Sequence, residues 1–475
     1  MPVGGLIMND KKEKKQIKAI DPIIIIIGIV ILAALCTWIL PGGAFERAVD
    51  PTSGAELVVP GTYQATEKNP IGFMDFLMSF TKGMQKAGSI IFFLLIVGGM
   101  MEIIKATGAL HAGIGNLVKV LGNKQLLMIP ICIIAFSIIS STAACCEEYL
   151  AFLPLMYAAC VACGFDSFVA VMLLMGSSAI GFAAGPANAF TTGIAHEIAG
   201  LPTFSGMGLR IALLVVLNIV TIAFLWRYAA KIKKNPTLSP MYEIDKANAQ
   251  PIDASEVKPL TTRQALVLAV FLGGFVMIAV LVITKGYYMD EISALFIIMG
   301  ILAGIIGGLS INDMAKALVV GAKDMLYAGF MVGLCRAATN IMSDANVFDT
   351  LINYAGTMLQ GMNTNIAAVG MYIFQTAFDF LVPSGSGQAS ITMPFMAPLA
   401  DLLDMTRQTA TLAFHMGDGY TNVISPTSGT CMAALAVCNI PWSKWIKFIA
   451  PLWAIWAVIS CVFMVIAVQI NYGPF

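Results

Sequence analysis

Charged side chains are scarce in this sequence. They make up 11% of its 475 residues, whereas a water-soluble protein carries about a quarter. The 27 basic and 27 acidic side chains cancel to a net charge of zero, so there is no basic excess to neutralise nucleic-acid phosphates. The composition predicts a surface that mostly faces something other than water, and it excludes a nucleic-acid partner.

Catalytic and metal-binding motifs are also missing. The only histidines are His111, His196 and His415, and His196-Glu197 lacks the second histidine of a zinc-protease motif. No phosphate-binding Gly-Lys-Ser/Thr loop is present, which argues against an ATP-driven pump. An intramembrane serine protease would need Ser386 to pair with His415, without the usual Gly-x-Ser-Gly spacing. We predict no enzyme, no metal and no cofactor. The ten cysteines lie mostly in apolar segments and are interpreted as packing residues.

Long apolar runs are what the sequence has instead. Of its 54 charged residues, 25 fall within 1–21, 41–70 and 227–263. Apolar runs separated by a few polar stretches predict an all-α, polytopic membrane protein. The first run follows a Lys-rich leader without a cleavage site, so we interpret it as a retained helix. The expected spans are 22–40, 88–106, 206–228, 264–284, 290–310, 325–346 and 444–470.

Four other apolar segments are interrupted by polar or flexible residues. Two of them, 125–163 and 364–402, look like hairpins with irregular tips near residues 145 and 385. The segments that follow, 166–200 and 404–440, break at 181–188 and 417–429. Non-helical backbone at membrane depth is tolerated only where it is buried or lines a wet cavity. The two tips and two breaks therefore predict one polar site.

These features recur 240 residues apart, which indicates an internal duplication. The matching pairs are Pro154 and Pro394, Met156 and Met396, and Pro186 and Pro426. Basic residues concentrate in the leader and the central linker, so both are expected in the cytoplasm. Counting spans from there makes the halves inverted repeats, with about nine transmembrane helices plus two re-entrant hairpins.

Broken helices in inverted halves are typical of secondary transporters, whose substrate lies near the membrane midplane. Helix N-termini there can hold a carboxylate, while hydroxyls and acids can hold a cation. Asp418, Asn188 and Asn422 are the candidates for a coupling Na⁺ or H⁺. The candidate substrate-binding residues are Thr142, Glu147, Glu148, Asn188, Thr191, Ser384, Gly385, Ser386, Gly387, Gln388, Asp418, Thr421, Asn422, Ser425 and Thr427.

Each of the sharpest candidates has a plainer interpretation. Asp418, between two glycines, is costly at membrane depth unless it is paired or hydrated, but it could form a structural ion pair with Arg336. Glu147 and Glu148 could cap a helix N-terminus instead of binding substrate. The glycine-rich tip at 384–388 could be only a tight turn.

The stretches 382–401, VPSGSGQASITMPFMAPLAD, and 417–429, GDGYTNVISPTSG, resemble the YfcC-type basic amino acid antiporters. That group is related to arginine/ornithine exchangers and to C4-dicarboxylate carriers of the DcuC type. The tip at 143–146 is less rich in glycine than the family would lead one to expect. The resemblance implies a homodimer of the ion transporter superfamily with an elevator mechanism.

Carried onto this chain, the resemblance places the transport domain at 125–200 and 364–440. Scaffold helices would occupy 22–124, 201–228, 264–363 and 441–475, with a cytoplasmic leader at 1–21 and a cytoplasmic linker at 229–263.

We therefore predict a secondary transporter of the plasma or inner membrane, with its N-terminus in the cytoplasm. Its substrate would be an amino acid, in particular a basic one carried by antiport or ion coupling, because acids at the site favour a cation over a dicarboxylate. The alternative is a symporter of a C4-dicarboxylate or another organic anion, coupled to Na⁺ or H⁺. A gated channel or a receptor-like membrane protein would need the same cavity without alternating access.

Overall fold

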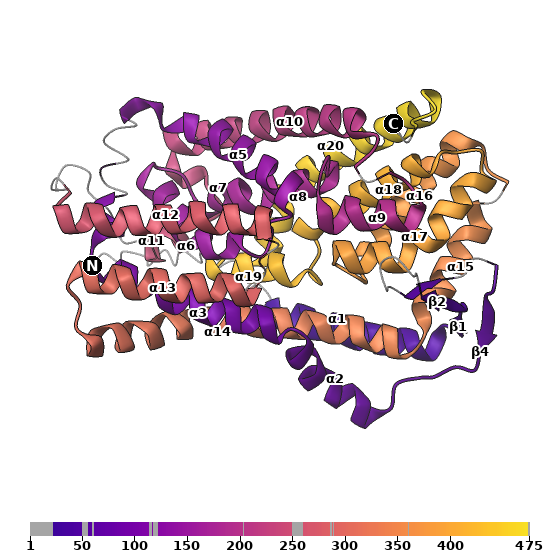
Figure 1. Cartoon of the computed structure of the whole chain (residues 1–475), viewed down its shortest axis with the longest axis horizontal. Helices are drawn as coiled ribbons and strands as arrows, with labels where there is room; N and C mark the ends of the chain where they lie inside the picture. The colour runs from indigo at the N-terminus through magenta and orange to yellow at the C-terminus, as the bar shows by residue number, and fades with distance from the viewer. Residues whose placement is uncertain are drawn as a thin grey trace, which may run out of the picture.

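The structure is a computed structural model that describes residues 22–49, 56–58, 61–113, 116, 122–202, 204–248, 260–285, 287, 289–359 and 361–473. These residues are nearly all helical, and most helices run along the long axis of the molecule (Figure 1). The Lys-rich leader and most of the polar end of the linker lie outside the described residues.

One group of helices is assembled around the long helix α14 (Ile311–Asp344). It packs against α1 (Pro22–Ile39), α2 (Phe73–Lys86) and α3 (Gly88–Ala106). The helices α13 (Met289–Gly307) and α12 (Thr262–Lys285) continue this layer from α3. A Cβ atom on Gly321 would lie 2.1 Å from the carbonyl oxygen of Gly98. Glycines therefore allow α3 and α14 to approach closely, as small residues do between membrane helices.

The first hairpin segment and its broken helix form a continuous series of short helices. Ala144 ends α5 with a φ of 57°, and Gly185 ends α8 with a φ of 42°, so both chain reversals use left-handed backbone. The series comprises η1 (Gly122–Leu127), α5 (Met128–Ala143), α6 (Tyr149–Ala162), α7 (Ser167–Val171), η2 (Met172–Gly176), α8 (Ser177–Ala184), η3 (Ala189–Gly193) and α9 (Ile194–Ala199).

A second series has the same order of hairpin, helix, break and helix. The side chains of Ser384, Thr406 and Ser428 cap the N-termini of its three main later helices. After α15 (Val347–Leu359), it comprises α16 (Thr364–Asp379), α17 (Gly385–Leu402), α18 (Arg407–Gly419), η5 (Thr421–Val423) and α19 (Gly429–Val437).

The two series form one packed body. Helix α18 contacts α8, α16 and α17, while α17 contacts α9 and α5 contacts α8. The long helices α10 (Met207–Lys234) and α20 (Trp442–Gln469) pack on this body, against α8 and α16 respectively. Helices α14 and α3 meet it chiefly through α19 and α6.

The polar segments contribute small elements. The linker contains η4 (Pro236–Leu238) and α11 (Tyr242–Asn248). Within 41–70, β1 (Gly42–Ala44) pairs antiparallel with β4 (Gln64–Thr66), and β2 (Arg47–Val49) pairs with β3 (Glu56–Val58). The all-α prediction describes the bulk of the fold but missed these strands, because three-residue pairings leave too short a pattern to read.

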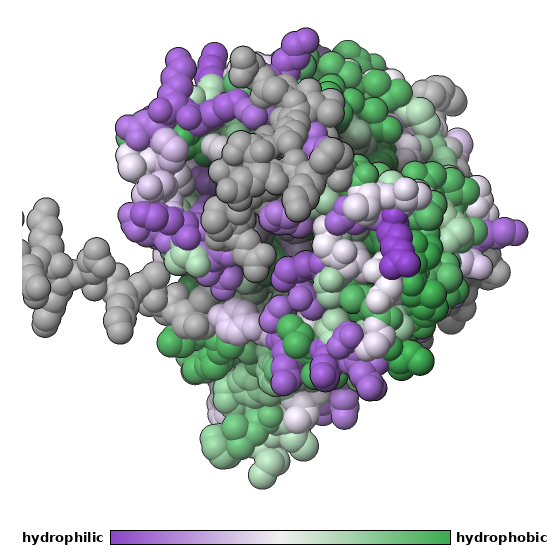
Figure 2. Space-filling view, turned by 90° about the vertical axis from the view of Figure 1, so that its left-hand side faces the viewer, coloured by the Kyte–Doolittle hydropathy of each residue, from purple (hydrophilic) through white to green (hydrophobic). Residues whose placement is uncertain are grey.

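Seven helices among the described residues are apolar and long enough to cross a membrane. Exposed apolar side chains such as Ile131, Ile219 and Val458 give them a surface suited to lipid. Figure 2 shows hydrophilic side chains gathered on the end of the molecule that lies at the left of Figure 1, with hydrophobic ones on its flanks. The seven are Gly88–Ala106, Lys124–Thr142, Ser167–Ala184, Met207–Lys234, Asp290–Gly307, Ile311–Asp344 and Trp442–Gln469.

A polytopic membrane protein is therefore confirmed. The count of about nine spans, the inverted orientation and the re-entrant entry of the hairpins stay predictions. One of the seven helices, Lys124–Thr142, is the first arm of the expected first hairpin and is by itself long enough to span. Shorter apolar helices at Ile23–Ile39, Tyr149–Ala162 and Thr262–Ile278 complete the apolar set.

Candidate functional site

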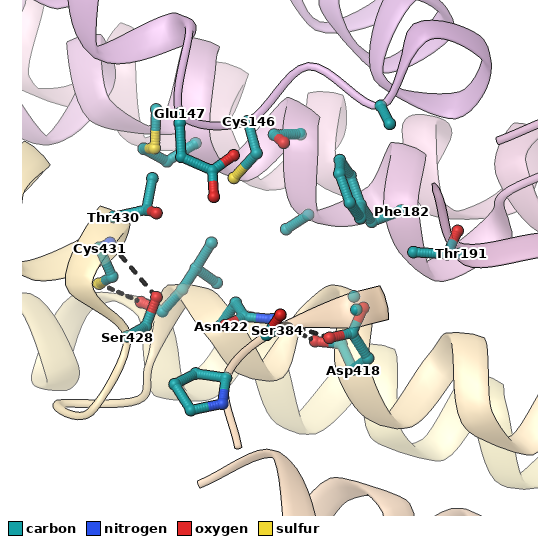
Figure 3. Close-up of a pocket in the computed structure, with 18 of the residues that line it drawn as sticks. Cys146, Glu147, Phe182, Thr191, Ser384, Asp418, Asn422, Ser428, Thr430 and Cys431 are labelled. Carbon is teal, nitrogen blue, oxygen red and sulfur yellow. Dashed lines mark hydrogen bonds between the residues drawn. The ribbon is translucent and has the colours of Figure 1, made fainter. Parts of the chain in front are cut away.

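A cavity of about 210 Å³ lies where the two hairpin tips and the two helix breaks meet. Residues of the first half line one side of the space and residues of the second half line the other (Figure 3). Arg336 of α14 and Tyr287, between α12 and α13, add two side chains from the other layer of helices. The cavity is therefore enclosed by every discontinuous element of the fold.

Two adjacent acids form the first tip, between α5 and α6. Glu148 is 7% exposed, and its Oε2 accepts a hydrogen bond of 2.9 Å from the backbone N–H of Cys146. Glu147 projects into the space between the two halves (Figure 3). Glu148 thus stabilises the turn before α6, but its side chain does not cap that helix as the plainer interpretation expected, and both acids line the cavity.

The second tip places the N-terminus of α17 at the cavity. Ser384 caps this helix by accepting from the N–H of Gly387, and Ser384, Gly385 and Ser386 all line the space. A Cβ atom on Gly385 would lie 2.6 Å from Cγ2 of Thr191 in the first break. Glycine is needed here because the tip touches the opposite half of the molecule.

Asp418 faces the same tip from the last turn of α18. It is 1% exposed, and its Oδ1 accepts a hydrogen bond of 3.2 Å from Nδ2 of Asn422. The same Nδ2 lies 3.2 Å from Oδ1 of Asp379, at the end of α16. Asn422 therefore bridges two buried carboxyl groups, of which only Asp418 lines the cavity.

A second helix N-terminus reaches the cavity at α19. Ser428 caps it by accepting from the N–H of Cys431, and Ser428, Thr430 and Cys431 line the space together (Figure 3). The first-turn N–H groups of a helix have no intrahelical acceptor and carry a positive partial charge. Two such ends and Arg336 can receive negative groups, while the three acids can receive positive ones.

Eight of the fifteen predicted binding residues line the cavity, and seven do not. The lining ones are Glu147, Glu148, Thr191, Ser384, Gly385, Ser386, Asp418 and Asn422. The others are Thr142, Asn188, Gly387, Gln388, Thr421, Ser425 and Thr427.

Most of the seven hold the surrounding backbone. Asn188 donates to the Ser140 carbonyl at 3.2 Å and accepts from the N–H of Thr191 at 3.1 Å, which shapes the first break. Gln388 donates to Oε1 of Gln375 at 2.7 Å. Thr142 is exposed and donates to the Ile138 carbonyl.

The remaining four lie beside the second tip and the second break. The N–H of Gly387 donates to the Ser384 hydroxyl that caps α17, and Thr421 is fully buried. Ser425 and Thr427 lie 2.6 Å apart through their hydroxyls, and Thr427 donates to the Phe380 carbonyl.

Arg336 is the lining residue whose role the sequence left open. The expected alternative, an ion pair with Asp418, is not formed: the ion pairs among the described residues join Arg47 to Asp349, Lys105 to Glu102 and Arg407 to Asp401. Arg336 lines the cavity together with Glu147, a residue of opposite charge. An arginine within an apolar span is rare enough to mark a functional position, and this signal could have placed it at the site. Phe182, Tyr287 and Thr430 carried no comparable signal.

Two relatives match the chain over nearly its whole length. It is 32% identical over 98% of its residues to the "Putative basic amino acid antiporter YfcC" of Escherichia coli (strain K12), covering 99% of that protein. It is 26% identical over 98% of its residues to an uncharacterised Haemophilus influenzae protein, covering 99% of it.

Two solved structures also align with most of the chain, at a TM-score of 0.41 each. The YdaH transporter of Alcanivorax borkumensis is 15% identical, and the match covers 95% of this chain and 99% of that one. MtrF of Neisseria gonorrhoeae is 14% identical, and the match covers 95% of this chain and 96% of that one. The family model described as "C4-dicarboxylate anaerobic carrier" matches residues 21–469. The resemblance found in the sequence is thereby confirmed: the chain belongs to the DcuC family and is a multi-pass membrane transporter.

Proposed function

We propose that this transporter carries a basic amino acid, with the cationic side chain of the substrate at the acids of the cavity. The observation that carries the proposal is the charge of the lining: Glu147, Glu148 and Asp418 face a single arginine, Arg336. Three acids against one base favour a substrate with a net positive charge, because a buried charge needs a compensating partner.

The α-carboxylate of such a substrate would bind at the positively charged groups that border the cavity. The N-termini of α17 and α19 and the guanidinium of Arg336 all border the cavity. Helix N-termini bind carboxylates through free N–H groups and the helix dipole. A substrate lying between Arg336 and Asp418 would satisfy both kinds of group at once.

A C4-dicarboxylate is the second candidate, because the family model carries that description. Its two carboxylates would need two positive anchors, and among the described residues Arg336 is the one basic side chain in the lining. The acids would then face a dianion, which costs binding energy in a site of low dielectric constant. The charge of the lining therefore favours the basic amino acid.

We further propose an elevator mechanism in which the residues 125–200 and 364–440 move as the transport domain. Their helices pack on one another, and α10 and α20 pack on them. We therefore place these two long helices with the moving body, whereas the sequence prediction assigned 201–228 and 441–475 to the scaffold. The layer around α14 would be the scaffold and the dimer interface of a homodimer. The hydrophilic end of Figure 2 would then face the cytoplasm of an inner-membrane protein.

Counterflow in proteoliposomes tests the substrate. Vesicles preloaded with arginine or ornithine should take up external labelled arginine faster than empty vesicles, and preloaded succinate should give no stimulation. Glu147→Gln should weaken this exchange, while the exposed Glu197→Gln in α9 should leave it unchanged. Stimulation by succinate without stimulation by any basic amino acid would overturn the proposal in favour of dicarboxylate transport.

A further inference from the structure

Asp379 is a buried acid that does not line the cavity but shares a hydrogen-bond donor, Asn422, with Asp418, which does. It is the last residue of α16 and is fully buried. Its Oδ1 lies 3.2 Å from Nδ2 of Asn422, while its Oδ2 is buried without a hydrogen-bond donor. A buried carboxylate oxygen left without a donor is costly and needs an explanation.

Asp418 is the neighbour that can explain it. One amide joins the two acids, because Nδ2 of Asn422 lies 3.2 Å from Oδ1 of Asp379 and 3.2 Å from Oδ1 of Asp418. An ionised carboxylate only accepts hydrogen bonds, so a bond between two carboxyl groups requires that one of them carry a proton. The arrangement therefore accommodates one proton between the two acids.

The surroundings of the pair also favour a proton. Its bridging partner, Asn422, is neutral, and the other titratable groups that act on Asp418 and its surroundings are Glu147 and the Cys146 thiol of the first tip, which add no positive charge. Arg336 also lines the cavity but does not form an ion pair with Asp418. Two unprotonated carboxylates side by side in this interior would repel each other without compensation.

Only one member of the pair is accessible to a substrate. Asp418 lines the cavity beside Gly385, where a Cβ atom would lie 3.1 Å from Oδ2 of Asp418 (Figure 3), whereas Asp379 is not among the lining residues. A cationic group that reaches Asp418 replaces the charge compensation that the proton supplies. The proton and the substrate cation thus compete for the same carboxylate.

We propose that Asp379 and Asp418 share one coupling proton, and that the proton and the cationic group of the substrate exclude each other at Asp418. Binding of the substrate releases the proton into the water of the cavity, and departure of the substrate allows one proton to bind again. The exclusion half of this inference rests on the proposed basic substrate; the shared proton does not.

Proton release tests the exclusion. Arginine added to the purified full-length protein in weakly buffered solution with a pH indicator dye should release about one proton per bound substrate. Asp379→Asn should still bind arginine, since residue 379 is outside the cavity lining, but should release far less proton. Release by Asp379→Asn equal to that of the wild type would overturn the inference. The exposed Asp404→Asn is the matched control, since Asp404 has a φ of 53° that asparagine tolerates.

Infrared spectroscopy tests the shared proton without any substrate. The wild type should show the carbonyl stretch of a protonated carboxyl group, which disappears as the pH is raised. Asp379→Asn and Asp418→Asn should each lose this band, and Asp404→Asn and Asp379→Glu should keep it. A band unchanged in both asparagine variants would overturn the shared proton. A band that behaves as expected in a protein that binds no basic amino acid would retain the proton site and reject the proposed substrate.

Discussion

Gly385 stands so close to Asp418 that a Cβ atom on Gly385 would lie 3.1 Å from Oδ2 of the aspartate. The second hairpin tip therefore lies against Asp418, the acid at which the proposed substrate cation would bind. Movement of the tip and occupation of Asp418 must influence each other, because protein interiors are packed too closely to absorb such contacts.

We expect Gly385→Ala to lower the transport rate. The added methyl group would lie 2.6 Å from Cγ2 of Thr191, so the tip would be pushed away from the first break. Overpacking of this kind costs about 1–3 kcal/mol, which corresponds to roughly a 5- to 150-fold loss of the arrangement in which the tip contacts the first break. Uptake of labelled substrate into proteoliposomes measures the effect.

Two further variants check this explanation. Thr191→Ser removes the methyl group that causes the closest contact, so it should partly restore transport in the double variant. Gly208→Ala in α10 should change little, because no atom lies within 4 Å of a Cβ placed there. No rescue by Thr191→Ser would show that the tip contact is not what limits transport.

Arg336→Gln should weaken binding of arginine by about 10- to 100-fold, because a charge-assisted hydrogen bond to the carboxylate is worth about 1.5–3 kcal/mol. Agmatine lacks that carboxylate, so its affinity should change little. Thermal-shift titrations of both ligands measure the difference. The exposed Lys323→Gln in the same helix is the control. An equal loss for arginine and agmatine would contradict a carboxylate role for Arg336.

Arg210 should be needed for stability. It is fully buried, donates to the Ser205 carbonyl at 2.5 Å and to Oε1 of Gln408 at 3.3 Å, and lies 3.0 Å from Nε2 of His196. Arg210→Met would remove this partner from His196, Gln408 and the Ser205 carbonyl, at a cost of about 1–3 kcal/mol each. The apparent melting temperature of the purified protein should fall by several degrees. Lys231→Ala, exposed in the same helix, should leave it unchanged.

The linker contact should strengthen as the pH falls. Asp245 accepts hydrogen bonds from the N–H of Ser167 at 2.9 Å and from the Tyr157 hydroxyl at 3.2 Å, and burial raises its pKa above the ordinary value of 3.8. Burial likewise raises the pKa of Asp166, which accepts from the Ser239 hydroxyl at 2.6 Å. Between each raised native pKa and 3.8 the folded state binds more protons than the unfolded state, so the free energy of unfolding rises as the pH is lowered through this window.

Asp245→Asn imitates the protonated acid, because its amide can accept from Ser167 and donate to Tyr157. We expect this variant to have a weaker dependence of the melting temperature on pH than the wild type between pH 8 and the acid limit of solubility. Asp404→Asn should keep the wild-type dependence. A steeper dependence in Asp245→Asn would contradict the raised pKa.

The polar breaks were accessible to sequence reasoning because local chemistry produces them. Gly185 ends α8 and the prolines at 186 and 426 disfavour a continued helix in the two breaks, while Ser384 and Ser428 cap the helices that follow them. Glu147, Ser384 and Asp418 were therefore recognised as site residues before any geometry was known. The same rule selects Thr142 and Gln388, yet neither lines the cavity, because a tip has two sides and its sequence does not say which one faces inward.

The sequence by itself determined a helical membrane protein with two interrupted segments, since scarce charge and long apolar runs leave few other ways to satisfy the backbone. Only the tertiary structure decided which groups meet. Arg336 reaches the cavity through the packing of α14 on α19, and Asp379 reaches Asp418 through the packing of α16 on α18. Such contacts join residues dozens to nearly two hundred positions apart, and their register depends on side-chain packing that no local pattern records.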